Sequence, residues 1–155
     1  MSQYFLNGVK DGANVKEFNT LDAPVKELLL AAVEARKHAY CPYSNFAVGA
    51  AIRTTDGSIY TGCNIENGTY TAGICAERIA AAKAISEGKR EFIACAVVVQ
   101  QEDSLTTPCG VCRQFLAEFA AKKDFPIYMA KPISPPFRVL CTSIMELLPK
   151  SFFFE

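Results

Sequence analysis

The sequence lacks the features that mark two large classes of protein. Its 16 Lys and Arg residues balance 16 Asp and Glu residues, and it contains no basic run or tail. Because polynucleotide binding rests largely on the neutralisation of phosphates, this balance argues against a nucleic-acid partner and favours a small, nearly neutral ligand. No segment approaches the roughly 18 consecutive apolar residues of a membrane span, so we expect no membrane partner either.

The beginning of the chain, MSQYFLNGVKDGANVKEF, has neither a long apolar stretch nor a cleavage signature. We therefore expect a cytoplasmic protein, whose thiols stay reduced. Its seven cysteines, an odd number, are better interpreted as core residues or metal ligands than as disulfides. The single histidine, His38, lies next to Arg36 and Lys37 and is interpreted as exposed and inert.

The length of 155 residues predicts one domain, 1–155, with residues 1–20 as an irregular lead-in. Half of the residues are hydrophobic and only 21% are charged, which is a little low for a soluble chain. We therefore expect part of the apolar surface to be buried against another copy of the chain.

Hydrophobic periodicity predicts alternating helices and strands. The run at 92–100 is almost continuously apolar, which indicates a central strand covered on both faces, and Thr55-Asp56-Gly57 indicates a hairpin turn. The fold class is therefore α/β, with a mixed five-stranded sheet between helices in a three-layer α/β/α sandwich. The predicted helices are 22–41, 74–86, 109–121 and 143–148, and the predicted strands are 47–54, 58–63, 92–100, 127–131 and 138–142.

Two short stretches concentrate the candidate catalytic residues. GICAER contains Cys75, Glu77 and Arg78, and TPCGVCRQF contains Cys109 and Cys112. Each stretch opens a predicted helix, where free N–H groups and the positive end of the helix dipole favour thiolate. Helices that start at the ends of strands would bring the two stretches together.

The spacing of Cys109 and Cys112 alone is ambiguous, because CxxC serves redox proteins as readily as zinc sites. With Cys75 they would supply three ligands to a tetrahedral Zn²⁺ and leave the fourth position open for water, as a catalytic site requires. Two alternatives stay open. One is a thiol redox protein, and the other is a structural zinc module in which Cys63 or Cys141 supplies a fourth ligand.

Arg78 and Glu77 fit this interpretation. Zn²⁺ with three thiolates carries a net charge of −1, which makes it a weak Lewis acid. Arg78 shares a helical face with Cys75 and is expected to offset this charge by donating a hydrogen bond to the sulfur. Glu77 is expected to act as the general acid and base that moves protons from water to a ring nitrogen and to the leaving amine, as in zinc deaminases.

With these residues in place, the chain resembles the small, homotetrameric cytidine deaminases over roughly residues 25–152. The resemblance implies that fold and the hydrolysis of cytidine and deoxycytidine to uridine and deoxyuridine, a step of pyrimidine salvage. It also implies one zinc ion per chain, held by Cys75, Cys109 and Cys112, with Glu77 as proton carrier. The motifs that carry it are PYSNFAVGAA (42–51), GCNIENGTYTAGICAER (62–78), PCGVCRQF (108–115) and ELLPKSF (146–152).

The resemblance further assigns substrate contacts within one subunit. It implies that Phe46 packs against the nucleoside, that Asn64 and Glu66 hold the ribose hydroxyls, and that the backbone N–H of Ala76 meets the pyrimidine carbonyl. The assignment to Asn64 and Glu66 is physically consistent, because residues two apart at the end of a strand face the same way.

The resemblance also implies that Tyr70 and Phe152 reach the pocket of a neighbouring subunit, so that the active sites of a homotetramer are shared. A deaminase of a modified nucleoside antibiotic or of cytosine in polynucleotide is the nearest alternative. The segment GCNIEN favours a ribose with free hydroxyls. The lack of surplus basic charge, and a cysteine rather than a histidine as first ligand, argue against polynucleotide.

Overall fold

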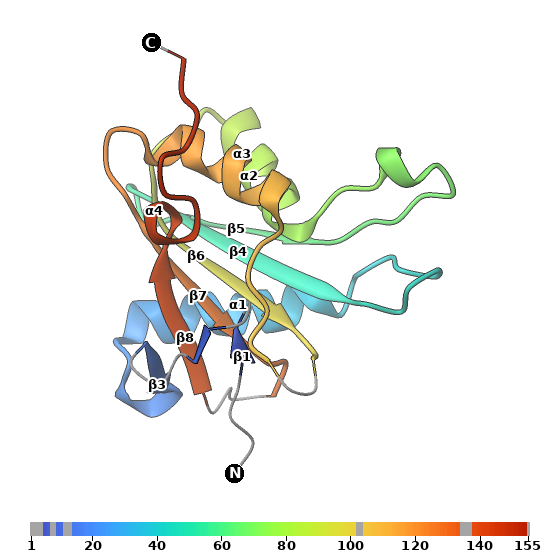
Figure 1. Ribbon diagram of the computed structural model, residues 1–155, viewed down its shortest axis with the longest axis horizontal. Helices are drawn as coiled ribbons and strands as arrows, with labels where there is room; N and C mark the ends of the chain where they lie inside the picture. Colours follow the sequence, from blue (N-terminus) through green and yellow to red (C-terminus); the bar gives the residue numbers. More distant parts are fainter. Residues whose placement is uncertain (1–4, 7–8, 11–13, 102–103, 134–137, 155) are drawn as a thin grey trace.

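The computed structural model (Figure 1) describes residues 5–6, 9–10, 14–101, 104–133 and 138–154. Helices and strands alternate along most of the chain, as the sequence predicts. In chain order the elements are β1 (Phe5–Leu6), β2 (Val9–Lys10), β3 (Val15–Glu17), η1 (Phe18–Thr20), α1 (Ala23–Arg36), β4 (Val48–Thr54), β5 (Ile59–Cys63), η2 (Tyr70–Ala72), α2 (Ala76–Ser86), β6 (Phe92–Val99), α3 (Gly110–Ala117), η3 (Glu118–Ala120), β7 (Pro126–Ala130), β8 (Arg138–Ser143) and α4 (Ile144–Leu147).

The main sheet has the strand order β3-β8-β7-β6-β4-β5. Among its described strands only β6 and β7 pair in parallel, so the predicted mixed sheet is confirmed. The predicted number of five strands is wrong, because β3 adds a sixth by pairing antiparallel with β8. This strand lies inside the expected irregular lead-in, of which residues 1–4, 7–8 and 11–13 lie outside the described part. Three residues are too few to show a strand periodicity, so only the pairing reveals β3.

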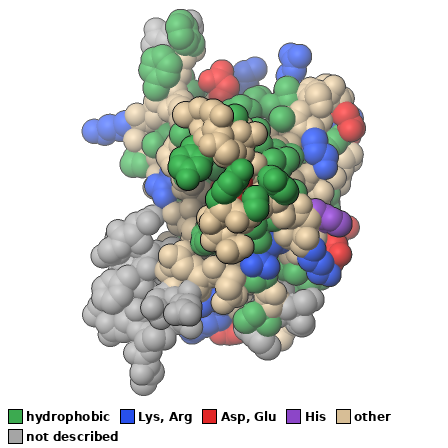
Figure 2. Space-filling model, turned by 90° about the vertical axis from the view of Figure 1, so that its right-hand side faces the viewer, with side chains coloured by type: hydrophobic (Ala, Val, Ile, Leu, Met, Phe, Trp, Pro, Cys, Tyr) green, Lys and Arg blue, Asp and Glu red, His purple; other side chains and the backbone are tan. Residues whose placement is uncertain are grey.

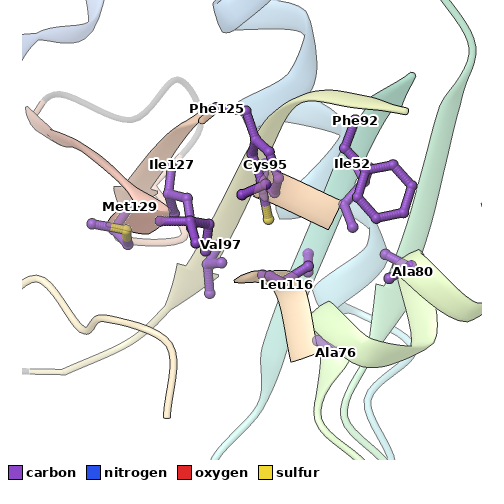
Figure 3. Packing of buried hydrophobic residues seen from close by; sticks show 14 of the residues in the cluster. Ile52, Ala76, Ala80, Phe92, Cys95, Val97, Leu116, Phe125, Ile127 and Met129 are labelled. Carbon is purple, nitrogen blue, oxygen red and sulfur yellow. The ribbon is translucent and has the colours of Figure 1, made fainter. Parts of the chain in front are cut away.

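The sheet separates two apolar layers, which confirms the three-layer sandwich. Side chains of a strand alternate between its faces. Ile52 of β4 and Val97 of β6 therefore pack in one cluster with α2, α3 and α4, whereas Ala51 and Ala96 pack in the other with α1. Figure 1 shows α1 on one face of the sheet and α2 with α3 on the other, and Figure 3 shows the first cluster. No described helix has the length and apolar character needed to cross a membrane.

Two glycines let the helices approach the sheet closely. A Cβ atom on Gly49 of β4 would lie 2.1 Å from the backbone oxygen of Ala32 in α1. A Cβ atom on Gly62 of β5 would lie 2.4 Å from the backbone oxygen of Ala76, the first residue of α2. The absence of a side chain at Gly62 therefore sets how deeply the start of α2 sits on the sheet.

The predicted hairpin turn joins β4 to β5, and Asp56 organises it. Its carboxylate accepts hydrogen bonds from Thr54 Oγ1 at 2.6 Å and from Ser58 N at 3.2 Å, and its other oxygen lies 2.6 Å from Lys89 Nζ. These partners, Lys89 first and Thr54 second, hold the pKa of Asp56 well below its usual value. The turn is therefore fastened by an ionised carboxylate.

Because the Asp56 carboxylate is held in its ionised form, we expect the folded protein to lose stability in acid. A group whose pKa is lower in the folded state stabilises the protein above its unfolded pKa, which is about 3.9 for Asp. This contribution should fall as the pH drops from about 5 towards 2. In urea denaturation, Asp56→Asn should show a smaller fall over that range than wild type. The exposed Glu34→Gln variant on α1 is the control, and equal pH dependence in wild type and Asp56→Asn would contradict the prediction.

Candidate metal centre and pocket

The sulfur atoms of Cys75, Cys109 and Cys112 all lie within 4.8 Å of one another. Cys75 is the N-cap of α2, Cys109 is the N-cap of α3, and Cys112 lies in the first turn of α3. The two helices pack on the same face of the sheet, so their N-termini meet. An antiparallel bridge between Ile65 and Ile74 holds the segment that enters α2.

The three sulfurs fit a zinc ion. A tetrahedral Zn²⁺ with Zn–S bonds of about 2.3 Å separates its sulfurs by roughly 3.8 Å, and the Sγ atoms of Cys75 and Cys109 lie 3.8 Å apart. Arg78 points Nη2 at the Cys75 sulfur at 3.9 Å, and its Nε is the one buried side-chain nitrogen or oxygen without a partner in the described part of the chain. A half-buried guanidinium beside the sulfurs supports a site built for thiolates and a cation.

A fourth protein ligand is not found among the described residues, since no further His, Cys, Asp or Glu joins the three cysteines. Cys63 is one of the two cysteines considered as a fourth ligand of a structural zinc site. Its thiol instead points to the backbone oxygen of His38 at 3.3 Å. Cys141, the other, interacts with the oxygen of Val139 at 3.8 Å. The structural zinc module is therefore disfavoured, and the cluster keeps the open character of a catalytic site.

The cluster also shifts the pKa values of its members. Hydrogen bonding from Cys112, together with Arg78 and Cys109, lowers the pKa of Cys75 to about 5, although burial opposes the change. The same bond to Cys75 and burial raise the pKa of Cys112. Binding a metal to all three sulfurs would release the protons that their thiols still carry.

Glu77 lies in the first turn of α2 and is only 4% exposed. Burial raises the pKa of its carboxyl to about 7, and the negative Cys75 adds to the shift, whereas the interaction with Cys112 partly offsets it. Carboxylates are rarely buried to this extent without a structural or chemical reason. Glu77 therefore combines two properties of a general acid and base, a sheltered position and contact with the group that would hold the metal.

A pocket of about 550 Å³ opens onto two of the sulfurs. Many of its lining residues belong to the loops that project at the right of Figure 1, and Figure 2 shows that face, where apolar side chains gather near the centre. The residues predicted from the sequence that line it are Asn64, Glu66, Tyr70, Cys75, Arg78 and Cys109. The polar and aromatic lining residues that the sequence did not single out are Tyr43, Ser44 and Asn67.

Glu66 and Asn64 hold the loop before β4 from the side of the pocket. Glu66 accepts hydrogen bonds from the backbone N–H of Tyr43 at 2.9 Å, from that of Ser44 at 3.2 Å and from the Ser44 hydroxyl. The Ser44 hydroxyl makes the largest contribution to a lowered pKa of Glu66. Asn64 donates to Phe46 O and accepts from the N–H of Val48, both at 2.8 Å. Both side chains are therefore fixed before any ligand arrives.

Other predicted site residues lie outside the lining. Phe46 is 40% exposed, and Ala76, Glu77 and Cys112 are buried behind the surface of the pocket. Phe152 is 67% exposed on the C-terminal segment, and it is held there by a hydrogen bond from Gln114 Nε2 to its backbone oxygen at 2.9 Å.

The aromatic residues at the edge of the pocket are unusually exposed. Tyr70 lines the pocket but is 83% exposed, and its ring packs edge-on against Tyr43 at 6.4 Å. Phe152 and Phe154 form a second edge-on pair, with ring centres 5.8 Å apart. Large exposed aromatic side chains in pairs are typical of surfaces that contact another molecule.

The chain is similar to known proteins in sequence and in fold. The family described as the cytidine and deoxycytidylate deaminase zinc-binding region matches residues 23–128. A cytidine deaminase of Sporosarcina psychrophila is 44% identical over 128 residues, which cover 83% of this chain and 90% of the relative. A probable cytidine deaminase of Dictyostelium discoideum is 44% identical over 122 residues, which cover 79% of each.

A solved structure supports the same relation. The crystal structure of cytidine deaminase from Burkholderia pseudomallei superposes with a TM-score of 0.74 at 41% identity, covering 81% of this chain and 97% of that chain. The cysteines of the cluster lie within the matched region, and the similarity in sequence and fold extends well beyond them. The chain therefore belongs to the cytidine and deoxycytidylate deaminase family.

Proposed function

We propose that the protein hydrolyses cytidine and deoxycytidine to uridine and deoxyuridine with release of ammonia, as a step of pyrimidine salvage. The observation that carries this proposal is a single pocket lined both by sulfurs of the three-cysteine cluster and by the fixed polar side chains of Asn64 and Glu66. A nucleoside has the matching chemistry, with an amine to be removed at one end and ribose hydroxyls at the other. The pocket volume of about 550 Å³ suits a small ligand.

Cys75, Cys109 and Cys112 would hold one zinc ion per chain. When bound, zinc supplies Lewis-acid chemistry, because it lowers the pKa of a water molecule at its open position towards 7. Glu77 would take up one proton from water on its carboxylate and deliver it to the ring nitrogen, and would then carry the second proton of that water to the departing amine. Arg78 would balance the surplus negative charge of the thiolates through its hydrogen bond to Cys75.

Substrate recognition would use groups that are already in place. Asn64 retains a second amide hydrogen, and the ionised Glu66 retains acceptor capacity, so both can bind ribose hydroxyls. Ala76 is the first residue of α2, and its backbone N–H can donate to the pyrimidine carbonyl, because the first N–H groups of a helix have no intrahelical partner. Phe46, in the loop before β4, would pack against the nucleoside.

A homotetramer with shared active sites would explain the exposed aromatic residues. Tyr70 and Phe152 project from the subunit, and burial against neighbouring subunits would place them around another subunit's pocket. Exposed aromatic surface of this kind is costly in an isolated subunit. The three thiols also require a compartment that keeps them reduced, which supports a cytoplasmic location.

A substrate panel with and without metal tests this proposal. Zinc-loaded protein should convert cytidine and deoxycytidine, monitored by ultraviolet absorbance, but should not convert cytosine within an oligonucleotide. Activity should disappear on removal of zinc by a chelator and return on its addition, at about one zinc per chain. Turnover of the oligonucleotide or of a modified nucleoside antibiotic but not of cytidine would contradict the assignment. A metal-free protein with a reversible disulfide would identify a redox protein.

A further inference from the structure

Arg113 holds each of the three residues that lead into α3. Its Nη2 donates to Thr107 Oγ1 at 2.7 Å, its Nε donates to Pro108 O at 2.7 Å, and its backbone N–H donates to Cys109 O at 2.9 Å. The guanidinium therefore holds the two residues directly before Cys109, whereas the bond to Cys109 O is the main-chain bond of the first helical turn.

The remaining arm of the guanidinium reaches a different element. Arg113 Nη1 donates to the backbone oxygen of Leu147, the last residue of α4, at 3.0 Å. Helix α4 is itself anchored in the core by the buried side chain of Ile144. Arg113 thus connects the loop before α3 to a rigid neighbour. Only a guanidinium offers three separate nitrogens in the rigid fork that these acceptors require.

The exposed position of Cys109 explains why the hydrogen bonds of Arg113 matter for the cluster. Cys112 is buried and Cys75 is half-buried, whereas Cys109 is exposed. Gly110, which follows it, is also exposed, and a Cβ atom there would meet nothing within 4 Å. Side-chain packing therefore does little to locate this sulfur. The hydrogen bonds from the Arg113 guanidinium to Thr107 and Pro108, which directly precede Cys109, help to locate it instead.

We propose that Arg113 is a positioning residue that keeps the Cys109 sulfur in place and thereby slows the release of the metal. The proposal rests on the proposed function only in so far as the three cysteines hold zinc. It assigns Arg113 a role different from that of Arg78, which donates to a sulfur directly and adjusts charge.

The experiment compares Arg113→Lys with Arg53→Lys in the zinc-loaded full-length protein. Arg53 of β4 is a matched control, since its guanidinium likewise bridges segments, binding Gly57 O, Pro24 O and the Glu27 carboxylate. Zinc transfer to a coloured chelator in excess gives the release rate. We expect Arg113→Lys to release zinc about tenfold faster than wild type, in the range found when groups that orient metal ligands are lost. Arg53→Lys should stay within about twofold of wild type, whatever its melting temperature.

Both substitutions keep the positive charge. If zinc release is faster in Arg113→Lys but not in Arg53→Lys, the cause is therefore the lost hydrogen-bond geometry at Arg113 and not a change of charge. Equal release rates in the two variants would overturn the proposal. If Arg113→Lys fails to fold, Thr107→Val removes one acceptor and should still speed release severalfold, and an unchanged rate in that variant would overturn the proposal as well. Wild-type protein that holds zinc firmly but leaves cytidine intact would refute the proposed function alone, because the release rates would still decide the role of Arg113.

Discussion

Glu77→Gln is expected to lower the turnover of cytidine by about 10²–10⁴-fold while zinc content and melting temperature stay close to those of wild type. Glutamine has the shape of glutamate, so the buried position is refilled without a cavity. Its amide cannot accept and return a proton at neutral pH. Glu77 is not a member of the group of side chains that can hold the metal, so the ligand set is unchanged.

The measurement combines kcat from ultraviolet absorbance with the zinc-to-chain ratio and a thermal melt. Glu87→Gln is the matched control, because Glu87 lies at the opposite end of α2, where its exposed carboxylate accepts a hydrogen bond from Tyr60 at 3.0 Å. This control should keep normal turnover. Near-normal kcat in zinc-loaded Glu77→Gln would show that another group moves the proton, and loss of zinc would show that Glu77 belongs to the metal site.

Gly62→Ala is expected to destabilise the protein by about 3 kcal/mol and to weaken zinc binding. The new methyl group would lie 2.4 Å from the backbone oxygen of Ala76 and 2.7 Å from the backbone nitrogen of Ala80. Backbone atoms cannot rotate away as a flexible side chain does, so the start of α2 must move off the sheet. Cys75 and Glu77 would move with it.

Gly49→Ala is the informative comparison. Its methyl group would lie 2.1 Å from the backbone oxygen of Ala32 and 2.6 Å from the backbone nitrogen of Arg36, both on α1. Urea denaturation should therefore show a similar loss of stability, but zinc affinity should fall only in Gly62→Ala. Gly110→Ala, with open space around the new methyl group, should change stability by less than about 1 kcal/mol. Equal zinc affinities in the variants of Gly49 and Gly62 would contradict this account.

The layered fold could be predicted because its signals are local. An almost continuously apolar run marks β6 as a strand that is buried on both faces, and the turn residues around Gly57 mark the hairpin between β4 and β5. Strand β3 could not be found in this way. Its three residues become a strand only through pairing with β8, at the other end of the chain, and such a pairing leaves no local pattern.

The candidate site likewise contains residues that the sequence predicts and contacts that only the folded structure reveals. The spacing of Cys109 and Cys112 and the helix start at Cys75 selected three sulfurs that the structure brings together. The resemblance, rather than any pattern, pointed to Phe46, which lies outside the pocket lining. The contacts of Ser44 with Glu66 and of Arg113 with Leu147 join segments that are distant in sequence, so only the folded structure reveals them.

The position of β3 has a consequence for handling the protein. The region that matches the family begins at residue 23, after this strand, and β3 covers one side of β8. A chain that began at residue 23 but kept β8 would leave the N–H and C=O groups along one edge of β8 without their partners. An uncovered strand of this kind is a template for adding strands from other molecules. We therefore expect Val15–Glu17 to protect this edge of β8 from pairing with other molecules.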